Sequence, residues 1–241
     1  MNMNAIQHLL TQIHHLQTWL FPNACAFCNK LNDSGIFCSK CFGKVTFIEA
    51  PFCNKCGKLF TGGIPHNSLC SACINNERVF DTARALFVYD TYVRQLIVNI
   101  KQTGNRNLIS KCCSIIVAKY GVLFQNIDAI IPVPSHWSRI FIRGFNPSDV
   151  IALELSQLIG IPVTRKLKRI FHTKFQHKMS KLERIKNVQN AFRWQGRQLK
   201  NVLLVDDVFT TGATIEECAR TLRNSGVKKI LCVTFASTEA K

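Results

Sequence analysis

The chain has 241 residues, of which 47% are hydrophobic, and 31 Lys or Arg against 14 Asp or Glu give it a formal net charge of +17. This length accommodates one domain of ordinary size plus a small one. The sequence has no run of eighteen apolar residues and no basic segment ahead of an apolar core at its N-terminus, so it indicates neither a membrane span nor a signal peptide. We therefore expect a cytoplasmic location. The excess positive charge favours a polyanionic partner such as nucleic acid, and the alternative is a basic surface that serves solubility alone.

Apolar side chains recur at helical spacing between residues 6 and 20, with Gln, Thr and His between them. The pattern predicts an amphipathic helix within residues 1–22 that packs on its own protein.

Eight of the twelve cysteines form four C-x-x-C pairs between residues 23 and 76, namely Cys25/Cys28, Cys38/Cys41, Cys53/Cys56 and Cys70/Cys73. In a chain without an export signal such cysteines point to metal rather than to disulfides. Two pairs supply the four thiolates of a closed tetrahedral site, so the segment predicts a small zinc ribbon domain with structural Zn²⁺. Consecutive pairs sharing an ion and a cross-braced pairing both fit the spacing. The other four cysteines lie in apolar patterns and are expected in the core.

Residues 82–241 alternate strand and helix signals. Strands are predicted near 82–89, 128–135, 201–205 and 229–236, with helices near 92–101 and 108–123. Asn146 as N-cap, Pro147 at the first helical position and Gly160 beyond the last turn delimit a further helix. This alternation is typical of an α/β domain with a parallel sheet.

Residues 201–214 read NVLLVDDVFTTGAT and form the most informative stretch. A short apolar strand ends in Asp206 and Asp207, a hydroxyl-glycine turn follows, and a helix then runs to Gly226. Ligands of open α/β sheets bind beyond the carboxyl ends of strands, and a helix N-terminus attracts anions. Carboxylates accept hydrogen bonds from a sugar diol, whereas N–H groups and Thr hydroxyls donate to phosphate. The stretch predicts a sugar-phosphate site, and the alternative is a buried strand that runs into an ordinary capped helix.

Between residues 161 and 200 the chain has twelve Lys or Arg and one acid, Glu183, with aromatic residues among them. Cations that neutralise phosphates and aromatic rings that stack on bases favour single-stranded nucleic acid. The candidate contacts are Lys174, Lys178, Lys181, Arg184 and Lys186. The alternative is a hood over the active site, with Phe192 and Trp194 in the core.

The stretch from Val205 to Thr214 resembles the phosphoribosyl-pyrophosphate (PRPP) motif of type I phosphoribosyltransferases. The resemblance implies a parallel sheet flanked by helices, in which Asp206 and Asp207 hold the ribose 2′ and 3′ hydroxyls. It assigns the 5′-phosphate to Thr210, Thr211, Gly212, Ala213 and Thr214. Pyrophosphate would lie after the 128–135 strand, which makes Arg139, Arg143 and Lys101 its candidate ligands, and Mg²⁺ would accompany PRPP.

Several further motifs occur in order behind the C-x-x-C pairs: Pro132-Val-Pro134, Arg143-Gly144-Phe145-Asn146, Thr173-Lys174-Phe175-Gln176 and Ala191-Phe192. Together they resemble the competence protein ComF family. The resemblance implies a role in natural transformation, with single-stranded DNA handled in the cytoplasm, a PRPP-binding pocket, and other DNA-uptake proteins as further partners. One alternative is an active transferase that passes ribose-5-phosphate from PRPP to a nitrogenous base in nucleotide salvage and releases pyrophosphate. Another is a PRPP sensor.

Overall fold

The computed structural model of the chain describes residues 25, 27–28, 30–31, 36–60, 65, 67–75, 77–170 and 190–238. The chain divides into two compact units, Met1–Val45 and Thr46–Lys241, which we call the N-terminal unit and the sheet unit. The helix predicted within residues 1–22 lies outside the described residues.

The N-terminal unit contains the first two C-x-x-C pairs. Its one described helix, α2 (Ser39–Phe42), begins directly after Cys38. The rings of Phe27 and Phe37 stack with their centroids 4.9 Å apart. A backbone hydrogen bond of 2.8 Å from the Cys25 N–H to the Lys30 carbonyl closes the chain around the first pair.

The sheet unit is built on a parallel four-stranded sheet in the order β1-β6-β5-β2. These strands are β1 (Thr82–Val88), β2 (Ala129–Pro132), β5 (Asn201–Phe209) and β6 (Lys229–Ser237). Every residue of β2 is buried, as are Val202, Leu203, Leu204 and Val205 of β5. Strands buried on both faces read as unbroken apolar runs, which is why these segments lack alternation in the sequence.

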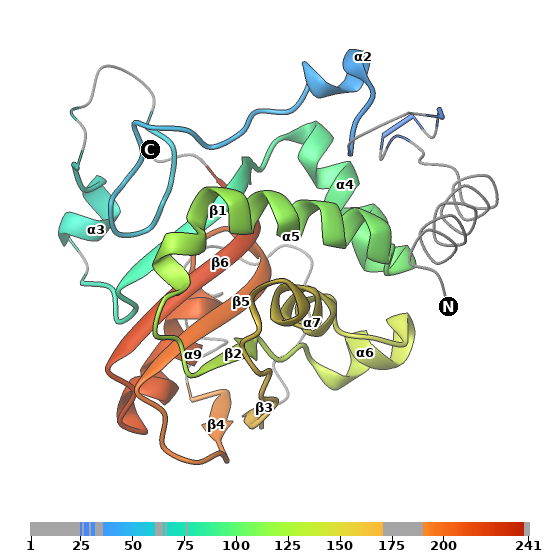
Figure 1. Ribbon diagram of the computed structural model, residues 1–241. Helices are drawn as coiled ribbons and strands as arrows, with labels where there is room; N and C mark the ends of the chain where they lie inside the picture. The colour runs from blue at the N-terminus through green and yellow to red at the C-terminus, as the bar shows by residue number, and fades with distance from the viewer. Residues whose placement is uncertain are drawn as a thin grey trace, which may run out of the picture. The chain divides into compact units, whose positions relative to one another are not determined.

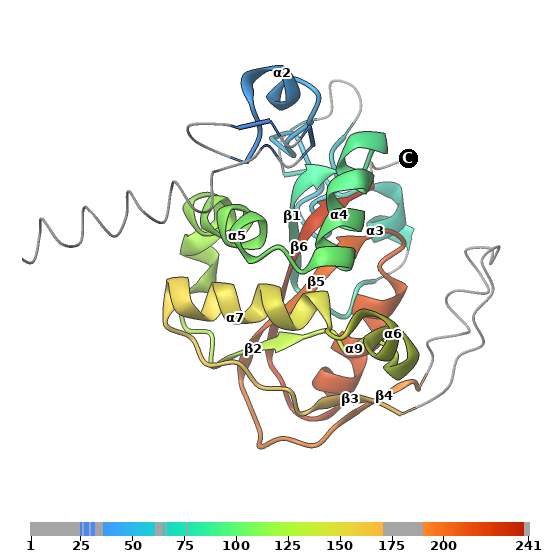
Figure 2. The same cartoon turned by 90° about the vertical axis from the view of Figure 1, so that its right-hand side faces the viewer.

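Helices cover both faces of this sheet, with α5 and α7 on one face and α9 on the other (Figures 1 and 2). The helices of the sheet unit are α3 (Ser71–Asn75), α4 (Thr91–Thr103), α5 (Arg106–Tyr120), α6 (Trp137–Arg143), α7 (Pro147–Ile159) and α9 (Ala213–Asn224), with a 3₁₀ turn, η1 (Gly121–Phe124), after α5. The parallel sheet flanked by helices confirms the predicted fold class. The short helix α6 was not predicted, because its exposed apolar residues give no amphipathic pattern.

The stretch Arg106–Phe124, which covers α5 and η1, is long and apolar enough to cross a membrane by length and composition, with a mean hydropathy of 1.4. Several of its apolar side chains, however, face the protein interior, although Val122 is exposed. Ile109, Cys112 and Ile116 are fully buried, and the Tyr120 hydroxyl donates a 3.0 Å hydrogen bond to the Ala85 carbonyl of β1. The stretch therefore serves as a core helix of the sheet unit.

A two-stranded antiparallel ribbon lies beside the sheet, formed by β3 (Leu167–Arg169) and β4 (Phe192–Trp194). The chain reaches it along the open edge of β2, where Ile130 exchanges backbone hydrogen bonds of 2.9 Å with Pro162 and Thr164. Leu167 and Phe192 are buried in the core that α9 shares with the sheet. Residues 171–189, between the two ribbon strands, lie outside the described part of the chain.

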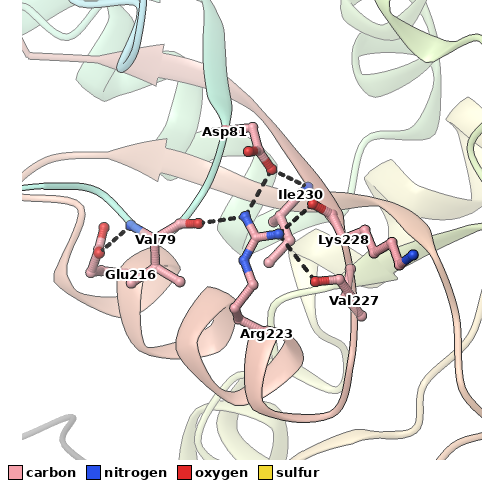
Figure 3. A network of polar contacts seen from close by, with 7 residues as sticks. All are labelled: Val79, Asp81, Glu216, Arg223, Val227, Lys228 and Ile230. Carbon is pink, nitrogen blue, oxygen red and sulfur yellow. Dashed lines mark hydrogen bonds and ion pairs between the residues drawn. The ribbon is translucent and has the colours of Figure 1, made fainter.

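A polar network ties the segment before β1 to α9 and β6 (Figure 3). The Arg223 guanidinium donates to the Val79 carbonyl at 2.8 Å and to Asp81 Oδ2 at 2.9 Å. Asp81 Oδ2 also accepts the Ile230 N–H at 2.7 Å, and Glu216 Oε1 accepts the Val79 N–H at 2.8 Å. These bonds fix the connection from the second cysteine group to the sheet.

Candidate functional site

The two carboxylates of the predicted sugar-phosphate site lie within β5 rather than after its end. The strand continues through Phe209, paired with β6, whereas its pairing with β2 stops at Pro132 opposite Val205. The predicted strand end was wrong by four residues, because β6 extends far enough to pair with the acidic segment. Asp206 and Asp207 therefore lie where β5 loses one neighbour and the sheet opens.

Side chains from two helices contact this acid pair. The Ser148 hydroxyl, in the first turn of α7, donates a 2.8 Å hydrogen bond to Asp206 Oδ1, which also accepts the Asp207 N–H at 2.9 Å. Lys101 Nζ, in the last turn of α4, lies 3.0 Å from Asp207 Oδ2. Lys101 thus belongs to the site, and its contact with pyrophosphate remains a prediction.

Burial dominates the electrostatics of Asp206. Burial, the largest cause, and the neighbouring charge of Asp207 raise the pKa of this carboxyl, Ser148 and Lys101 oppose them, and the pKa moves from 3.8 to about 7. A carboxyl in this environment gains from a hydrogen-bond donor such as a sugar hydroxyl, because its own hydration has been removed.

The turn after β5 has the conformation that close approach of an anion requires. Gly212 adopts a left-handed conformation with φ of 78°, and a Cβ at this position would lie 2.5 Å from Phe209 Cζ, so no other residue fits without a shift. Two bonds from Thr238 fix the turn, from its N–H to the Phe209 carbonyl and from its hydroxyl to the Thr210 carbonyl. The first N–H groups of α9 then follow at Ala213 and Thr214, at the positive end of the helix dipole.

The loop after β2 is held by Asn146, which the sequence assigned to the N-cap of α7. Its side chain makes no capping hydrogen bond. Instead, Asn146 Nδ2 donates to the Val133 carbonyl at 3.0 Å and Oδ1 accepts the Ser135 hydroxyl at 2.7 Å. Pro147 and the left-handed Gly160 delimit the helix as predicted. Asn146 therefore positions the loop that carries the pyrophosphate candidates.

Arg139 and Arg143 both lie on α6. Desolvation lowers the pKa of Arg139 and the charge of Arg143 lowers it further, whereas Asp207 and Asp206 raise it. These opposing effects mean that Arg139 lies within electrostatic range of the acid pair. Arg169 of β3 joins this group, since its pKa is lowered by burial and then by Arg139. Neither Arg169 nor Ser148 was predicted from the sequence, because only tertiary packing brings them to the site.

A cavity of about 210 Å³ opens beside this loop. Its walls are Pro134, Ser135, His136, Trp137, Lys168, Arg169 and Ile170. The five candidate contacts for nucleic acid, Lys174 to Lys186, lie outside the described residues.

The cysteines of the four C-x-x-C pairs gather in two groups of four, and in each group all four sulfur atoms lie within 4.8 Å of one another. The first group is Cys25, Cys28, Cys38 and Cys41, and the second is Cys53, Cys56, Cys70 and Cys73. Consecutive pairs therefore share a site, and the cross-braced pairing is not formed. The sulfur atoms of Cys28 and Cys38 are 3.7 Å apart and those of Cys56 and Cys70 are 3.6 Å apart.

These separations fit zinc. Tetrahedral Zn²⁺ with Zn–S bonds near 2.3 Å places its sulfur ligands about 3.8 Å apart, whereas a disulfide needs about 2.05 Å. The hydrogen bond from Cys56 is the largest cause that lowers the pKa of Cys53, to about 4, which favours a thiolate. Four sulfur donors fill every position on each ion, so both sites are structural.

The second cysteine group belongs to the core of the sheet unit. All four of its residues are buried in one apolar cluster with Phe80 and Phe209. The Lys55 carbonyl accepts the Ala83 N–H at 2.8 Å, and a Cβ on Gly57 would lie 2.4 Å from the Ala83 carbonyl oxygen. The backbone of this metal site is thus packed directly against β1.

Two family models match the chain, the Double zinc ribbon domain over residues 16–74 and the Phosphoribosyl transferase domain over residues 143–241. The chain is thus a zinc ribbon protein with a phosphoribosyltransferase-like domain. Competence protein F of Haemophilus influenzae is 30% identical over 80% of this chain and 86% of its own length. The chain belongs to the competence protein F family.

Other relatives extend the comparison. DNA utilization protein YhgH of Escherichia coli K12 is 28% identical over 87% of this chain and 94% of its own length. Competence protein ComFC of Bacillus subtilis is 24% identical over 78% of both chains. Among solved structures, orotate phosphoribosyltransferase from Aeropyrum pernix matches 62% of this chain and 67% of its own, at 18% identity and a TM-score of 0.36.

We predict that loss of the second zinc site destabilises the sheet unit far more than loss of the first. Cys53→Ser with Cys56→Ser should lower its stability by at least about 3 kcal/mol, or roughly 6–12 °C in melting temperature, because a metal site in the core is removed. The matched variant, Cys25→Ser with Cys28→Ser, should leave the melting temperature of the sheet unit unchanged. Thermal unfolding followed by circular dichroism tests this, and metal analysis should find about one zinc per chain in each variant. Equal losses in the two variants would contradict the assignment.

Asp206 should also make stability depend on pH. Because the folded state raises its pKa from 3.8 to about 7, the folded protein binds this proton more tightly than the unfolded chain does. Stability is therefore lost as pH rises through the window between about 4 and 7. Asp206→Asn keeps an acceptor for Ser148 and removes the charge, so it should match the unchanged protein near pH 4 and exceed its free energy of unfolding by about 2–4 kcal/mol at pH 8.

Urea unfolding at both pH values measures this difference. Asp149→Asn, which alters a partly exposed carboxylate paired with Arg165, is the control and should show no such gain at high pH. An Asp206→Asn protein that gains nothing between pH 4 and pH 8 would exclude a buried, destabilised carboxyl at this position.

Proposed function

We propose that this protein acts in natural transformation, where it handles incoming single-stranded DNA in the cytoplasm and binds PRPP in a phosphoribosyltransferase-like pocket. The observation that carries the PRPP assignment is the acid pair on β5. Asp206 and Asp207 lie where β2 leaves the sheet, next to a Gly212 turn that leads into the N-terminus of α9. Acceptors for a diol and donors for a phosphate thus meet at one edge of the sheet.

Cations near this edge support the assignment of a pyrophosphate group to it. Lys101 pairs with Asp207, and Arg139 lies within electrostatic range of both acids. When PRPP binds, Mg²⁺ would neutralise part of the pyrophosphate charge, and Arg139 and Arg143 of α6 would neutralise the rest.

The DNA role is supported by the relatives and by charge. The relatives are named for competence and for DNA utilization, and they align with most of this chain. A net charge of +17 suits a polyanionic partner, whereas a small-molecule site needs only a few local cations. Other DNA-uptake proteins are expected as partners of the same complex.

Binding of radiolabelled PRPP tests the pocket. The double substitution Asp206→Ala with Asp207→Ala should abolish measurable binding, because the ribose hydroxyls lose both acceptors. Asp149→Ala, which removes a carboxylate bonded to Arg165, should bind PRPP like the unchanged protein. Equal binding by the double variant would refute the assignment of the site.

Phosphoribosyl transfer is the second candidate function, favoured by the 210 Å³ cavity that His136 and Trp137 line beside the loop after β2. A nitrogenous base stacked there would be the acceptor. Incubation of the same samples with Mg²⁺, PRPP and a panel of nucleobases distinguishes the two functions, because transfer releases pyrophosphate and binding alone does not.

Affinity for a single-stranded oligonucleotide should fall steeply with salt, since each neutralised phosphate adds about −0.7 to the slope of log affinity against log salt. Charge reversal at Lys181, Arg184 and Lys186 should lower both the affinity and the slope. A salt titration by fluorescence anisotropy measures them. An affinity independent of salt would overturn the electrostatic basis of the DNA role.

A further inference from the structure

The ribbon β3–β4 and the turn after it carry a concentration of positive charge. Residues 165–170 and 190–200 contain seven Lys or Arg and no Asp or Glu. Six of these cations are exposed: Arg165, Lys166, Lys168, Arg193, Arg197 and Lys200. The ribbon lies on the side of the sheet unit away from α4 in both views (Figures 1 and 2).

Two of the cations face each other directly. Lys168 of β3 is the cross-strand partner of Arg193 of β4, and neither side chain forms an ion pair with any residue that the structure describes. Like charges at directly opposed positions destabilise a strand pair. The repulsion between these two side chains is therefore a cost that a bound anion would relieve.

A cavity of about 340 Å³ opens where β3 begins and β4 ends. Its volume is within the range of small-molecule sites. Trp194, Lys166 and Arg197 line it together with the amino end of β2. The indole of Trp194 is fixed in place, since its Nε1–H donates a 3.2 Å hydrogen bond to the Arg197 carbonyl and a Cβ on Gly196 would lie 2.4 Å from the ring. A ring held in this way offers a stacking surface without further loss of conformational freedom.

One carboxylate, Asp128, lines the cavity, and its charge favours a base over a phosphate as the occupant. Its Oδ2 accepts the N–H groups of Lys200 and Asn201 at 2.7 and 2.9 Å, and these two bonds are the main reason that its pKa is lowered. Asp128 is therefore ionised at neutral pH. A carboxylate repels a phosphate from the cavity but accepts a hydrogen bond from the amino group of a base.

We propose that the ribbon β3–β4 binds the backbone of single-stranded DNA, with phosphates on Lys168 and Arg193 and one unpaired base in the cavity beside Trp194. This inference rests on the proposed DNA role and gives it a location. In a duplex the bases are paired and stacked, so none can enter the cavity; the site requires a single strand.

The location also relates the two binding functions. The cavity lies at the amino end of β2, whereas Lys168 and Arg169 line the smaller cavity beside the loop that follows the carboxyl end of β2. Lys166 lines the larger cavity and Lys168 lines the smaller one, and two residues of extended chain span about 7 Å. A strand bound along the ribbon thus runs from one edge of the sheet towards the proposed PRPP pocket at the other.

Fluorescence anisotropy of a labelled 20-nucleotide single strand, with the full chain, tests the ribbon. Lys168→Glu with Arg193→Glu should weaken binding by at least about tenfold and reduce the salt slope by about 1.4, the value for two lost phosphate contacts. The matched control is Arg94→Glu with Arg106→Glu, two exposed cations on α4 and α5 with the same change in charge. The affinity of this control variant for the single strand should stay within about threefold of that of the unchanged protein, because distant charges are screened by salt.

A second measurement needs no variant. The unchanged protein is irradiated with an oligonucleotide that carries 5-bromodeoxyuridine, and the crosslinked peptide is identified by mass spectrometry. Crosslinks within residues 190–200 support the site, and crosslinks confined to other segments overturn it. Binding of the corresponding duplex as tightly as the single strand would also overturn it.

The outcomes separate this site from the DNA role itself. If the unchanged protein binds the oligonucleotide with a salt slope and both double variants bind equally well, the ribbon assignment fails and the DNA role stands. If the unchanged protein does not bind the oligonucleotide at all, the DNA role fails as well.

Discussion

The pairing of β5 is the constraint on which the rest of the sheet unit depends. The strand is paired on both sides as far as Val205 and only with β6 beyond it. The four residues before the acid pair are fully buried, so the carboxylates follow the core directly, at the position where β2 no longer pairs with β5. Ionised carboxylates at such a position are costly, which explains why α7 contributes Ser148 and α4 contributes Lys101.

The second metal site and the Gly212 turn are parts of one core. The rings of Phe80 and Phe209 meet edge to face with centroids 5.9 Å apart, within the cluster that holds Cys53 and its three partners. On its other side, the ring of Phe209 occupies the space above Gly212 that a Cβ would need. The metal site therefore supports the turn through a single aromatic side chain. The first metal site belongs to the N-terminal unit, which is a separate compact unit.

Charge of both signs is distributed unevenly over the sheet unit. Asp206 and Asp207 are set among Lys101 and Arg139 at the carboxyl edge of the sheet. The ribbon beside the amino edge has cations without acidic partners along its own strands. A small ligand that carries both hydroxyls and phosphates fits the first arrangement, and an extended polyanion fits the second.

Most of the strands and helices, and their order, could be predicted from the amino-acid sequence. Apolar runs identified the buried strands, Pro147 and Gly160 delimited α7, and the C-x-x-C spacing predicted two sets of four zinc ligands. These features are local, because each depends on residues within a few positions of one another. Local chemistry also placed the acid pair next to the Gly212 turn.

The contacts between these elements could not be predicted in this way, because they depend on packing between residues far apart in the chain. Strand β5 continues past its two acids because β6 is long enough to pair with them. The side chain of Asn146 bonds to the loop after β2 instead of capping α7. The cysteines pair consecutively, and the second group is buried against β1. Ser148, Arg169 and the opposed Lys168 and Arg193 acquire their roles from neighbours distant in the chain, and contacts of that kind leave no periodic or spacing signal in the sequence.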